Sequence, residues 1–446
     1  MDRSAEPSQA HAFPGSLYSR RQAIAVLAAM VLVTIGLNLV VLPMNLMVDP
    51  IRKTLGISDV QISLLLGAVG AGPFVVMSLV GGWLTDRMSG RWLLIAAIAT
   101  WSLGAALCAT ARSYETFILG RALIHVGAGL KFPVAMTWIN DAFPPEQRGR
   151  AVGAFFVVLG TAPSLCVALS GMAQSAAEGG AFASWSAVIG PEPWRAATLV
   201  LAAPGLLTLL AVLGLPDRRG ALASEAEGAS VAKTAALPLG LLVTLVAAAA
   251  LIVMVDGANL AWMATVFTRD YGYDAQQAGF SFGLVTLLAG SMGPLIGGWL
   301  ADSLYRRHGA VGRVWLAAAA CLCCAPLLAV YVVKAPVWLT LALTLNGICT
   351  VAAVSITYIN AQALLPDRIR GLGTGMIAAT TALVGSAGPT LVALSSEHWL
   401  AGPMALPRSI ALVGACGSLL AAGVLAAGAL RLSRARASLA PANRVN

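Results

Sequence analysis

Four ionisable side chains interrupt long apolar runs of the 446-residue sequence, and these residues are the best suited to chemistry: Arg121, His125, Lys131 and Asp256. A charge at the centre of a membrane helix costs about 2.5–3.5 kcal/mol on insertion scales, so such residues usually have a function. On a helix, Arg121 and His125 share one face, and Lys131 lies roughly 80° further round. We interpret the four as candidate solute-binding or ion-coupling residues.

The charges indicate what such a site would bind. A guanidinium offers two parallel donors to a carboxylate, so a cationic helix opposite Asp256 suits an anionic solute. Asp256 is the one carboxylate in the middle of an apolar run, which makes it the candidate carrier of a coupling proton. The other three keep structural alternatives: Arg121 or Lys131 reaching the membrane interface, Lys131 pairing with Asp141, and His125 as a hydrogen-bonded filler.

Neutral polar side chains in the apolar runs form a second group. Asn38 and Asn45 are seven residues apart and share a helix face. The others lie in the seventh and tenth apolar runs: Asn259, Trp262, Asn346, Thr357, Tyr358 and Asn360. We expect runs 1, 4, 7 and 10 to line a central cavity, so these residues either contact a solute or form helix–helix hydrogen bonds.

The elements that carry these residues are membrane-spanning helices. Hydrophobic residues make up 58% of the chain and charged residues 11%, against roughly 45–50% and 25% in soluble domains. A span needs about 20 mostly apolar residues, and about twelve such runs fit the chain. The fold class is therefore an all-α polytopic membrane protein. We place its spans at 22–47, 60–84, 92–111, 116–139, 150–173, 195–215, 237–267, 277–301, 312–333, 337–363, 371–395 and 408–430.

The spans divide into two six-helix halves, 22–215 and 237–430, joined by a polar linker at 216–236 and flanked by tails at 1–21 and 431–446. Gly81-Gly82-Trp83-Leu84-Thr85-Asp86 recurs at the same point of the second half as Gly297-Gly298-Trp299-Leu300-Ala301-Asp302. Two parallel repeats around a central site are typical of alternating-access transporters.

Local signals add detail to this arrangement. Most loop Lys and Arg residues fall on the side of the tails, which predicts cytoplasmic termini, and we expect a bacterial inner membrane. Pro43 is expected to kink the first span. Trp185 and Trp194, in the connection 174–194, are expected at a membrane interface.

The stretch Gly82-Trp83-Leu84-Thr85-Asp86-Arg87-Met88-Ser89-Gly90-Arg91 resembles the signature loop between spans 2 and 3 of the major facilitator superfamily, and Arg121-x-x-x-His125-x-Gly127 resembles its span-4 motif. Residues 55–61 and 132–144 are similar to organic-anion symporters, and residues 366–371 and 388–391 to spinster-like transporters. The resemblance implies the major facilitator fold of two pseudo-symmetric bundles. It also implies transport of a solute without ATP.

The same resemblance implies a cytoplasmic gate. Asp86 would pair with Arg148 or Arg150 in one conformation and release it in the other; the alternative is that the loop charges only set the topology. The candidate gating residues are Gly82, Asp86, Arg87, Arg91, Glu146, Arg148, Arg150, Gly298, Asp302, Arg306, Arg307 and Arg370.

This chain departs from both groups in two places. Val40-Val41 stand where those transporters usually carry an Asp-Arg pair in span 1, and Ala128 stands where they carry a glutamate in span 4. Coupling through the usual carboxylates is therefore not expected.

Three function classes remain at this point. The leading one is a secondary transporter for a small organic anion, coupled to protons through Asp256 or running as a facilitator. The second is an exporter of amphipathic or lipid-like compounds, and the third is a sensor or scaffold that no longer transports. No Walker motif, metal-ligand spacing or nucleophile–base pair is present, so we expect neither an enzyme nor a cofactor, with protons as the candidate coupling ion. Partners are a solute and the bilayer, without nucleic acid, and the chain is expected to be monomeric.

Overall fold

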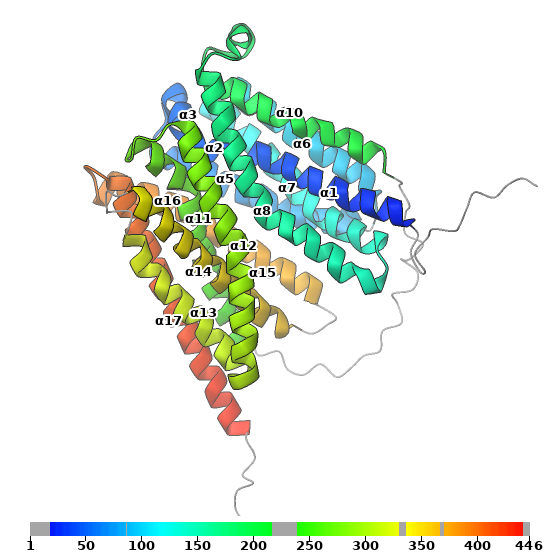
Figure 1. The fold of residues 1–446 in the computed structure, drawn as a ribbon, viewed down its shortest axis with the longest axis vertical. Coiled ribbons are helices and arrows are strands. Elements are labelled where there is room, and N and C mark those ends of the chain that lie inside the picture. The colour runs from blue at the N-terminus through cyan, green and yellow to red at the C-terminus, as the bar shows by residue number, and fades with distance from the viewer. Residues whose placement is uncertain (1–17, 86, 216–238, 330–335, 366–369, 440–446) are drawn as a thin grey trace, which may run out of the picture.

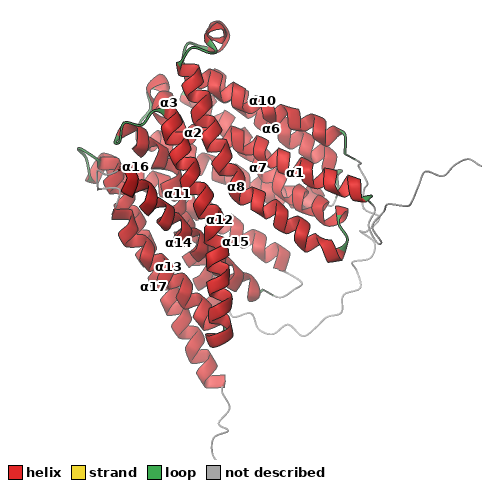
Figure 2. Cartoon of the chain, in the orientation of Figure 1, coloured by secondary structure: helices red, strands yellow, loops and turns green. Residues whose placement is uncertain are grey.

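The structure is a computed structural model that describes residues 18–85, 87–215, 239–329, 336–365 and 370–439. Within these ranges the chain is helical and contains no strand (Figure 2). This is the secondary structure that a bilayer favours, because a helix satisfies its own backbone hydrogen bonds where water is absent.

The helices of the first half are α1 (Arg20–Val41), α2 (Pro43–Leu46), α3 (Val48–Leu55), α4 (Asp59–Leu66), α5 (Ala68–Thr85), α6 (Gly90–Thr110), α7 (Tyr114–Ala142), α8 (Pro145–Glu178), α9 (Ser186–Ile189) and α10 (Pro193–Leu213). Those of the second half are α11 (Leu239–Arg269), α12 (Ala275–His308), α13 (Ala310–Leu327), α14 (Pro336–Ala363), α15 (Arg370–Gly385), α16 (Ala387–Leu394) and α17 (Ala405–Leu439). A 3₁₀ turn at Ala183–Trp185 precedes α9, and a π turn at Ser395–Trp399 follows α16.

Twelve segments of the described chain are long and apolar enough to cross a membrane, which confirms the predicted number. Several helices run past the apolar runs that predicted them. For example, α8 continues to Glu178, α12 to His308, and α17 through residues 431–439 of the predicted tail. The reason is that backbone hydrogen bonding continues through polar residues once a helix leaves the hydrocarbon.

Three spans are interrupted by breaks. The first breaks at Leu42, before Pro43, as predicted. The second breaks at Gly67, between α4 and α5, and the eleventh at Ser386, between α15 and α16. The two latter breaks face each other, because a methyl group added at Gly67 would lie 2.3 Å from the carbonyl oxygen of Ser386.

The helices form two groups that meet at one end and diverge at the other (Figure 1). We call the end where α1 begins and α17 finishes the terminal side, and the other end, with α2, α3 and α16, the opposite side. Across the boundary α8 packs along α12, while α4 and α5 pack against α16 and α15. The groups converge on the opposite side and separate toward the terminal side.

The α8–α12 contact depends on small residues. A methyl group added at Gly283 would lie 2.7 Å from the carbonyl oxygen of Ser164, and one added at Gly290 would lie 2.7 Å from that of Gly160. Thr286 Oγ1 donates to Ser164 Oγ at 3.2 Å in the same contact. Close backbone approach with an interhelical hydrogen bond is a usual way of joining helices where the hydrophobic effect cannot.

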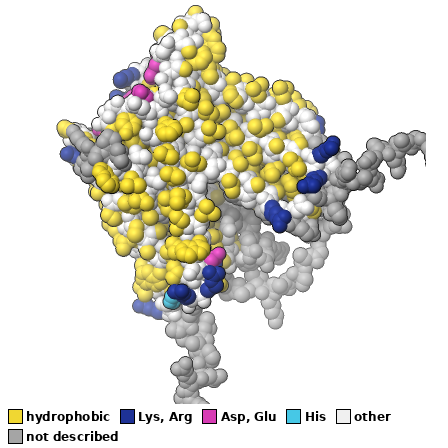
Figure 3. All heavy atoms as spheres, in the orientation of Figure 1, with side chains coloured by type: hydrophobic (Ala, Val, Ile, Leu, Met, Phe, Trp, Pro, Cys, Tyr) yellow, Lys and Arg dark blue, Asp and Glu magenta, His cyan; other side chains and the backbone are white. Residues whose placement is uncertain are grey.

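The surface has the two-zone character of a membrane protein. Hydrophobic side chains cover most of the face in Figure 3, and the dark blue Lys and Arg side chains gather at its edges. Large apolar side chains are strongly exposed along the spans, among them Leu295 at 73%, Trp299 at 69% and Leu210 at 67%. Such a continuous apolar surface is rare on a soluble monomer and is suited to lipid.

Candidate functional site

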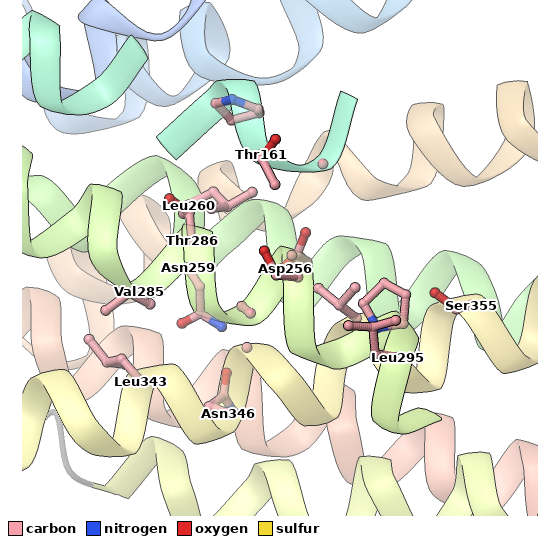
Figure 4. A pocket seen from close by; sticks show the side chains of 18 of the residues that line it. Thr161, Asp256, Asn259, Leu260, Val285, Thr286, Leu295, Leu343, Asn346 and Ser355 are labelled. Carbon is pink, nitrogen blue, oxygen red and sulfur yellow. The ribbon is translucent and has the colours of Figure 1, made fainter. Parts of the chain in front are cut away.

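A cavity of about 620 Å³ lies between the two halves, where α8 of the first half faces α11, α12 and α14 of the second. Most of its lining is apolar, as with Leu260, Val285 and Leu343. The polar lining residues are few and include Thr161, Asp256, Asn259, Thr286, Asn346 and Ser355 (Figure 4). An apolar cavity with a few polar groups is the usual form of a small-molecule site.

Of the described residues that line this cavity, Asp256 is the one with an ionisable side chain. It lies on the uninterrupted helix α11, where residues 256, 259, 260 and 263 form one stripe facing the cavity. Within the described residues the Asp256 carboxylate makes no ion pair within 4 Å. A carboxylate surrounded by apolar groups is unfavourable unless a proton, a cation or hydrogen-bond donors stabilise it. The site can therefore take up a proton or a donor group.

Two amides extend the polar part of the cavity. Asn259 is 5% exposed and lies on the same face of α11 as Asp256. Asn346, on α14, is 3% exposed, and its Nδ2 donates to the Cys324 carbonyl at 3.2 Å. The structure thus brings together Asp256 and Asn259 of the predicted site residues, together with the neighbouring Asn346.

Arg121 lies elsewhere, buried inside the first half and only 3% exposed. Its Nη1 donates to the Val41 carbonyl at 3.3 Å, and its Nε donates to the Leu65 carbonyl at 3.4 Å. Both acceptors stand just before helix breaks. For example, the backbone N–H of Asn45, four residues after Val41, donates to the carbonyl of Leu42 and leaves that of Val41 to Arg121. Arg121 therefore supports the breaks in spans 1 and 2, and the idea that it reaches the membrane interface is wrong.

His125 and Lys131 also face the interior of the first half. His125 Nδ1 forms a hydrogen bond with the Arg121 carbonyl at 2.9 Å, and its ring covers Gly70, where a methyl group would meet Nε2 at 2.5 Å. Lys131 is 4% exposed, and its Nζ donates to Thr34 Oγ1 at 3.2 Å and lies 5.9 Å from the centre of the Phe155 ring. No described carboxylate lies within ion-pair distance of Lys131, so the pairing with Asp141 and the position at the interface are not seen.

The remaining predicted polar residues make helix contacts outside the lining of this cavity. Asn38 and Asn360 each donate to a carbonyl of their own helix at 2.9 Å. Trp262 is fully buried and donates to the Pro389 carbonyl at 3.0 Å, and Tyr358 shares a short hydrogen bond with Thr381. Asn45 crosses between the halves, because its Nδ2 donates to the Leu260 carbonyl at 3.2 Å.

Sequence reasoning placed the cavity on spans 1, 4, 7 and 10. Spans 7 and 10 do line it, as α11 and α14, but the other walls are spans 5 and 8, as α8 and α12. The missed lining residues are mostly small, such as Thr161, Thr286 and Ser355. Hydroxyl residues are common in membrane helices, so no sequence signal set these apart.

The candidate gating residues that the structure describes lie at the terminal side. Asp302 pairs with Arg313 at the start of α13, with 2.9 Å between Oδ1 and Nη2, while Arg306 and Arg307 are exposed. The Arg87 guanidinium lies 4.2 Å from the Trp83 ring centre, and Arg91 donates to the Leu215 carbonyl.

Of the other candidate gating residues, the structure describes the surroundings of two glycines and one arginine. Gly82 and Gly298 have open space where a side chain would be, and Arg150 is exposed. Asp86 lies outside the described residues, as do the side chains of Glu146, Arg148 and Arg370. The pairing of Asp86 with Arg148 or Arg150 therefore stays a prediction.

A charged cluster that sequence reasoning missed joins the two halves on the opposite side. Arg269, the last residue of α11, donates from Nη1 to Asp59 Oδ2 at 2.8 Å and from Nε to Asp49 Oδ2 at 3.3 Å. Arg52 Nε lies 3.5 Å from Asp59 Oδ1 in the same cluster. In the predicted arrangement of spans the four residues fall in the short connections 48–59 and 268–276, where charges are ordinarily solvated, so their spacing carried no signal of a partner.

Two further hydrogen bonds close the same side. The Val60 amide donates to Glu397 Oε1 at 3.1 Å, and Ser63 Oγ donates to Thr390 Oγ1 at 3.3 Å. Apart from the Arg52–Asp59 pair within the first half, these contacts join α3 or α4 to the end of α11, to α16 and to the π turn that follows α16. The two halves are thus held together on the opposite side, while they diverge on the terminal side (Figure 1).

The connection before α10 corrects one expectation. Trp194 is 1% exposed, donates from Nε1 to Thr54 Oγ1 at 3.0 Å and packs edge-on against Phe117, so it is a core residue and not an interface residue. Beside it, Glu192 Oε2 lies 2.7 Å from Arg195 Nε. Partial burial is the largest single influence and would raise the pKa of Glu192, but the hydrogen bond from Arg195, a backbone hydrogen bond and the charge of Arg195 together outweigh it and lower that pKa.

Two helical bundles that enclose a cavity, held together on one side and apart on the other, define a membrane transporter of the alternating-access class. The chain belongs to the major facilitator superfamily, whose family model matches residues 24–389 and again residues 245–444. The two overlapping matches agree with the internal repeat. The chain is therefore a transporter of the secondary type and not an enzyme.

Relatives of known structure share the whole fold. A bacterial homologue of the human lysosomal transporter Spinster, crystallised in an inward-facing and occupied conformation, has a TM-score of 0.77 and 19% sequence identity, with 93% of this chain and 98% of that one covered. A D-xylose–proton symporter has a TM-score of 0.70 and 17% identity, with 91% and 97% covered. At these identities the likeness defines the fold.

Curated relatives match only in part. A probable sulfoacetate transporter of Cupriavidus necator is 26% identical over 278 residues, covering 58% of this chain and 60% of that protein. A probable nitrate/nitrite antiporter of Thermus thermophilus is 36% identical over 106 residues, covering 24% of each. The chain thus spans less than two thirds of the length of these relatives.

Proposed function

We propose that this chain carries a small organic anion together with a proton, and that Asp256 is the residue that takes up the proton. The observation that carries this proposal is the position of Asp256, a carboxylate with no ion pair among the described residues, in a mostly apolar cavity between the two halves. An ionised Asp256 would repel an anion, whereas a protonated one would donate a hydrogen bond to it. Binding of the anion and of the proton would then favour each other, which is the thermodynamic basis of symport.

Two observations support an anion as the solute. The names of relatives include a sulfoacetate and a nitrate/nitrite transporter. In addition, Lys131 is a buried cation with a hydroxyl and an aromatic face beside it and no described carboxylate in ion-pair distance. Removal of an uncompensated cation from water is unfavourable, so an anion that approaches this region from the interior would be stabilised.

The orientation follows from the charges at the two ends. The exposed arginines of the terminal side include Arg21, Arg87, Arg306, Arg307 and Arg431. Positively charged loops remain on the cytoplasmic side of an inner membrane, so both chain ends would be cytoplasmic. The conformation described here would then be closed toward the outside and would exchange solute with the cytoplasm.

A second candidate, transport of an amphipathic compound, is favoured by the walls of the cavity. Val157 and Leu295 line it from α8 and α12, lie within membrane-spanning segments, and are 65% and 73% exposed. Such walls suit an apolar body, with Asp256 receiving an amine or hydroxyl group. The two candidates differ in the residue that solute binding requires. Binding of the anion would require Lys131, whereas binding of the amphipathic compound would require Asp256.

Transport by purified protein in liposomes tests the proposal. With sulfoacetate or a similar small anion inside and outside the vesicles, Asp256→Asn should abolish accumulation driven by a pH gradient and should retain exchange of labelled for unlabelled solute. Asparagine resembles the protonated acid in shape, so exchange without net proton movement should persist. The matched control is Glu115→Gln, an exposed carboxylate outside the cavity.

The outcomes separate the candidates. Loss of anion binding in Lys131→Gln, with binding retained in Asp256→Asn, supports the anion. Loss of binding of an amphipathic amine in Asp256→Asn alone supports the second candidate. Accumulation of solute that is unchanged in Asp256→Asn at every pH gradient would exclude Asp256 as the proton carrier.

A further inference from the structure

A second cavity lies at the terminal side of the first half, outside the solute site. It measures about 480 Å³ and is formed where α1 and α6 begin and α10 ends. Its lining includes Arg21, Gln22, Ala25, Arg91, Leu213 and Leu215. Because these helices belong to one half, the cavity does not depend on the boundary between the halves.

The cavity is positively charged. Among the described residues it is lined by two arginines and by no acidic side chain. Neither Arg21 nor Arg91 forms an ion pair within the described part of the chain. Arg91 donates from Nη2 to the Leu215 carbonyl, which fixes the guanidinium, while its Nε is buried without a hydrogen-bond partner. A buried donor left in this state is unfavourable, and an acceptor entering the cavity would relieve it.

Apolar side chains continue from the cavity along the membrane face. Leu213, in the lining, is 47% exposed, and Ile24 and Trp92, close in sequence to Arg21 and Arg91, are 53% and 61% exposed. A soluble anion would gain nothing from this surface. A lipid would, because its acyl chains can cover the apolar side chains while its head group enters the cavity.

We propose that this cavity binds the phosphodiester head group of an anionic phospholipid, with Arg21 and Arg91 as its ligands. Guanidinium groups bind phosphate oxygens through paired, charge-assisted hydrogen bonds. Basic pockets between helices at the cytoplasmic boundary are suited to anionic head groups, and this position at the ends of three spans matches the head-group level. The inference concerns a different site from that of the transported solute.

The test is lipid binding by the full purified chain, measured by native mass spectrometry after titration with phosphatidylglycerol, phosphatidylcholine or inorganic phosphate. Wild-type protein should retain phosphatidylglycerol in preference to phosphatidylcholine. The double variant Arg21→Gln/Arg91→Gln should bind phosphatidylglycerol at least about ten-fold more weakly, as expected for the loss of two charged hydrogen-bonding groups. The control variant Arg431→Gln/Arg434→Gln removes two exposed arginines from the same side and should bind like wild type.

Several results would overturn the proposal. Equal losses in the double variant and the control would mean that charge attracts the lipid without a defined site. Displacement of phosphatidylglycerol by millimolar inorganic phosphate would mean that the cavity binds a soluble anion. If the double variant does not fold, Arg21→Gln alone decides, because Arg21 is exposed and makes no described side-chain hydrogen bond; unchanged phosphatidylglycerol binding by this variant would exclude the site.

Discussion

Arg269 and Asp59 lie 210 positions apart in the sequence, yet Arg269 Nη1 donates to Asp59 Oδ2 at 2.8 Å. Their side chains are 28% and 14% exposed, so the pair is partly shielded from water. Because Arg269 ends α11 and Asp59 begins α4, the ion pair joins the second half to the first. An ion pair at this position can exist in only one of the two conformations of an alternating-access transporter.

We predict that Arg269→Gln opens the opposite side. Each ion pair of this exposure contributes about 0.2–1 kcal/mol, and Arg269 contacts both Asp49 and Asp59, so a shift of about 1 kcal/mol, or roughly five-fold in the ratio of conformations, is expected. Spin labels at Lys53 and His398, both exposed, report the separation of the halves. The distance distribution should move to longer values in Arg269→Gln. The control is Arg112→Gln, which removes an exposed arginine on the same side. Equal distance distributions in wild type, Arg269→Gln and Arg112→Gln would exclude a gating role for Arg269.

Arg121 is predicted to act on stability and not on solute binding. Hydrogen bonds from charged donors contribute about 1.5–3 kcal/mol, and Arg121→Gln loses two of them to the Val41 and Leu65 carbonyls. The melting temperature should fall by several degrees, while the solute dissociation constant of the folded protein should stay within about two-fold of wild type. Arg408→Gln, which is exposed, should change neither quantity. A large loss of solute affinity in Arg121→Gln, with an unchanged melting temperature, would show that Arg121 acts in solute binding.

Asp302 and Arg313 are predicted to act as one unit. Asp302→Asn, Arg313→Gln and the double variant should lower turnover to a similar extent, because each removes the same 2.9 Å contact between α12 and α13. Solute affinity should change less than turnover, since the pair is distant from the cavity and biases the conformational equilibrium. Asp86→Asn, at the corresponding position of the repeat in the first half, should likewise lower turnover more than solute affinity. Additive effects of Asp302→Asn and Arg313→Gln would show that the two residues act independently.

Glu192 is predicted to make stability depend on pH. Its pKa is lowered in the folded chain, so its contact with Arg195 stabilises the fold above the unfolded pKa of about 4.3 and loses this effect as pH falls below it. Glu192→Gln should therefore lower the melting temperature at pH 7, and the difference from wild type should shrink toward pH 3.5. Glu178→Gln serves as control, because the glutamine can still accept the hydrogen bond from Gln174. A difference that grows as pH falls would mean that the sign of the shift is wrong.

The number of spans and the break at Pro43 could be predicted because each depends on local sequence. An apolar run long enough to cross hydrocarbon must be helical wherever it packs, and proline removes a hydrogen-bond donor wherever it stands. Asp256 could be selected for the same reason, since a carboxylate in an apolar run is unusual in any fold. Its predicted neighbour Asn259 lies on the same helix face and also lines the cavity.

Spacing alone could not decide which way a polar side chain faces. Arg121 and His125 do share a helix face, but this face packs on the breaks in spans 1 and 2. The carbonyls of Val41 and Leu65, which precede these breaks, accept hydrogen bonds from Arg121. The helical periodicity of α7 predicts only that the two residues share a helix face. Which neighbour they meet depends on where other helices bend.

The sequence by itself thus determined the helices, their number, the internal repeat and the choice of Asp256 as a carboxylate in the middle of an apolar run, because these follow from hydrophobicity, chain length and local backbone chemistry. Only the tertiary structure decided the walls of the cavity, the position of Lys131 beside Thr34, and the pairing of Arg269 with Asp59. These relationships join residues far apart in the chain. They depend on how two bundles pack through small residues such as Gly283, and a helix pattern contains no information on its distant partner.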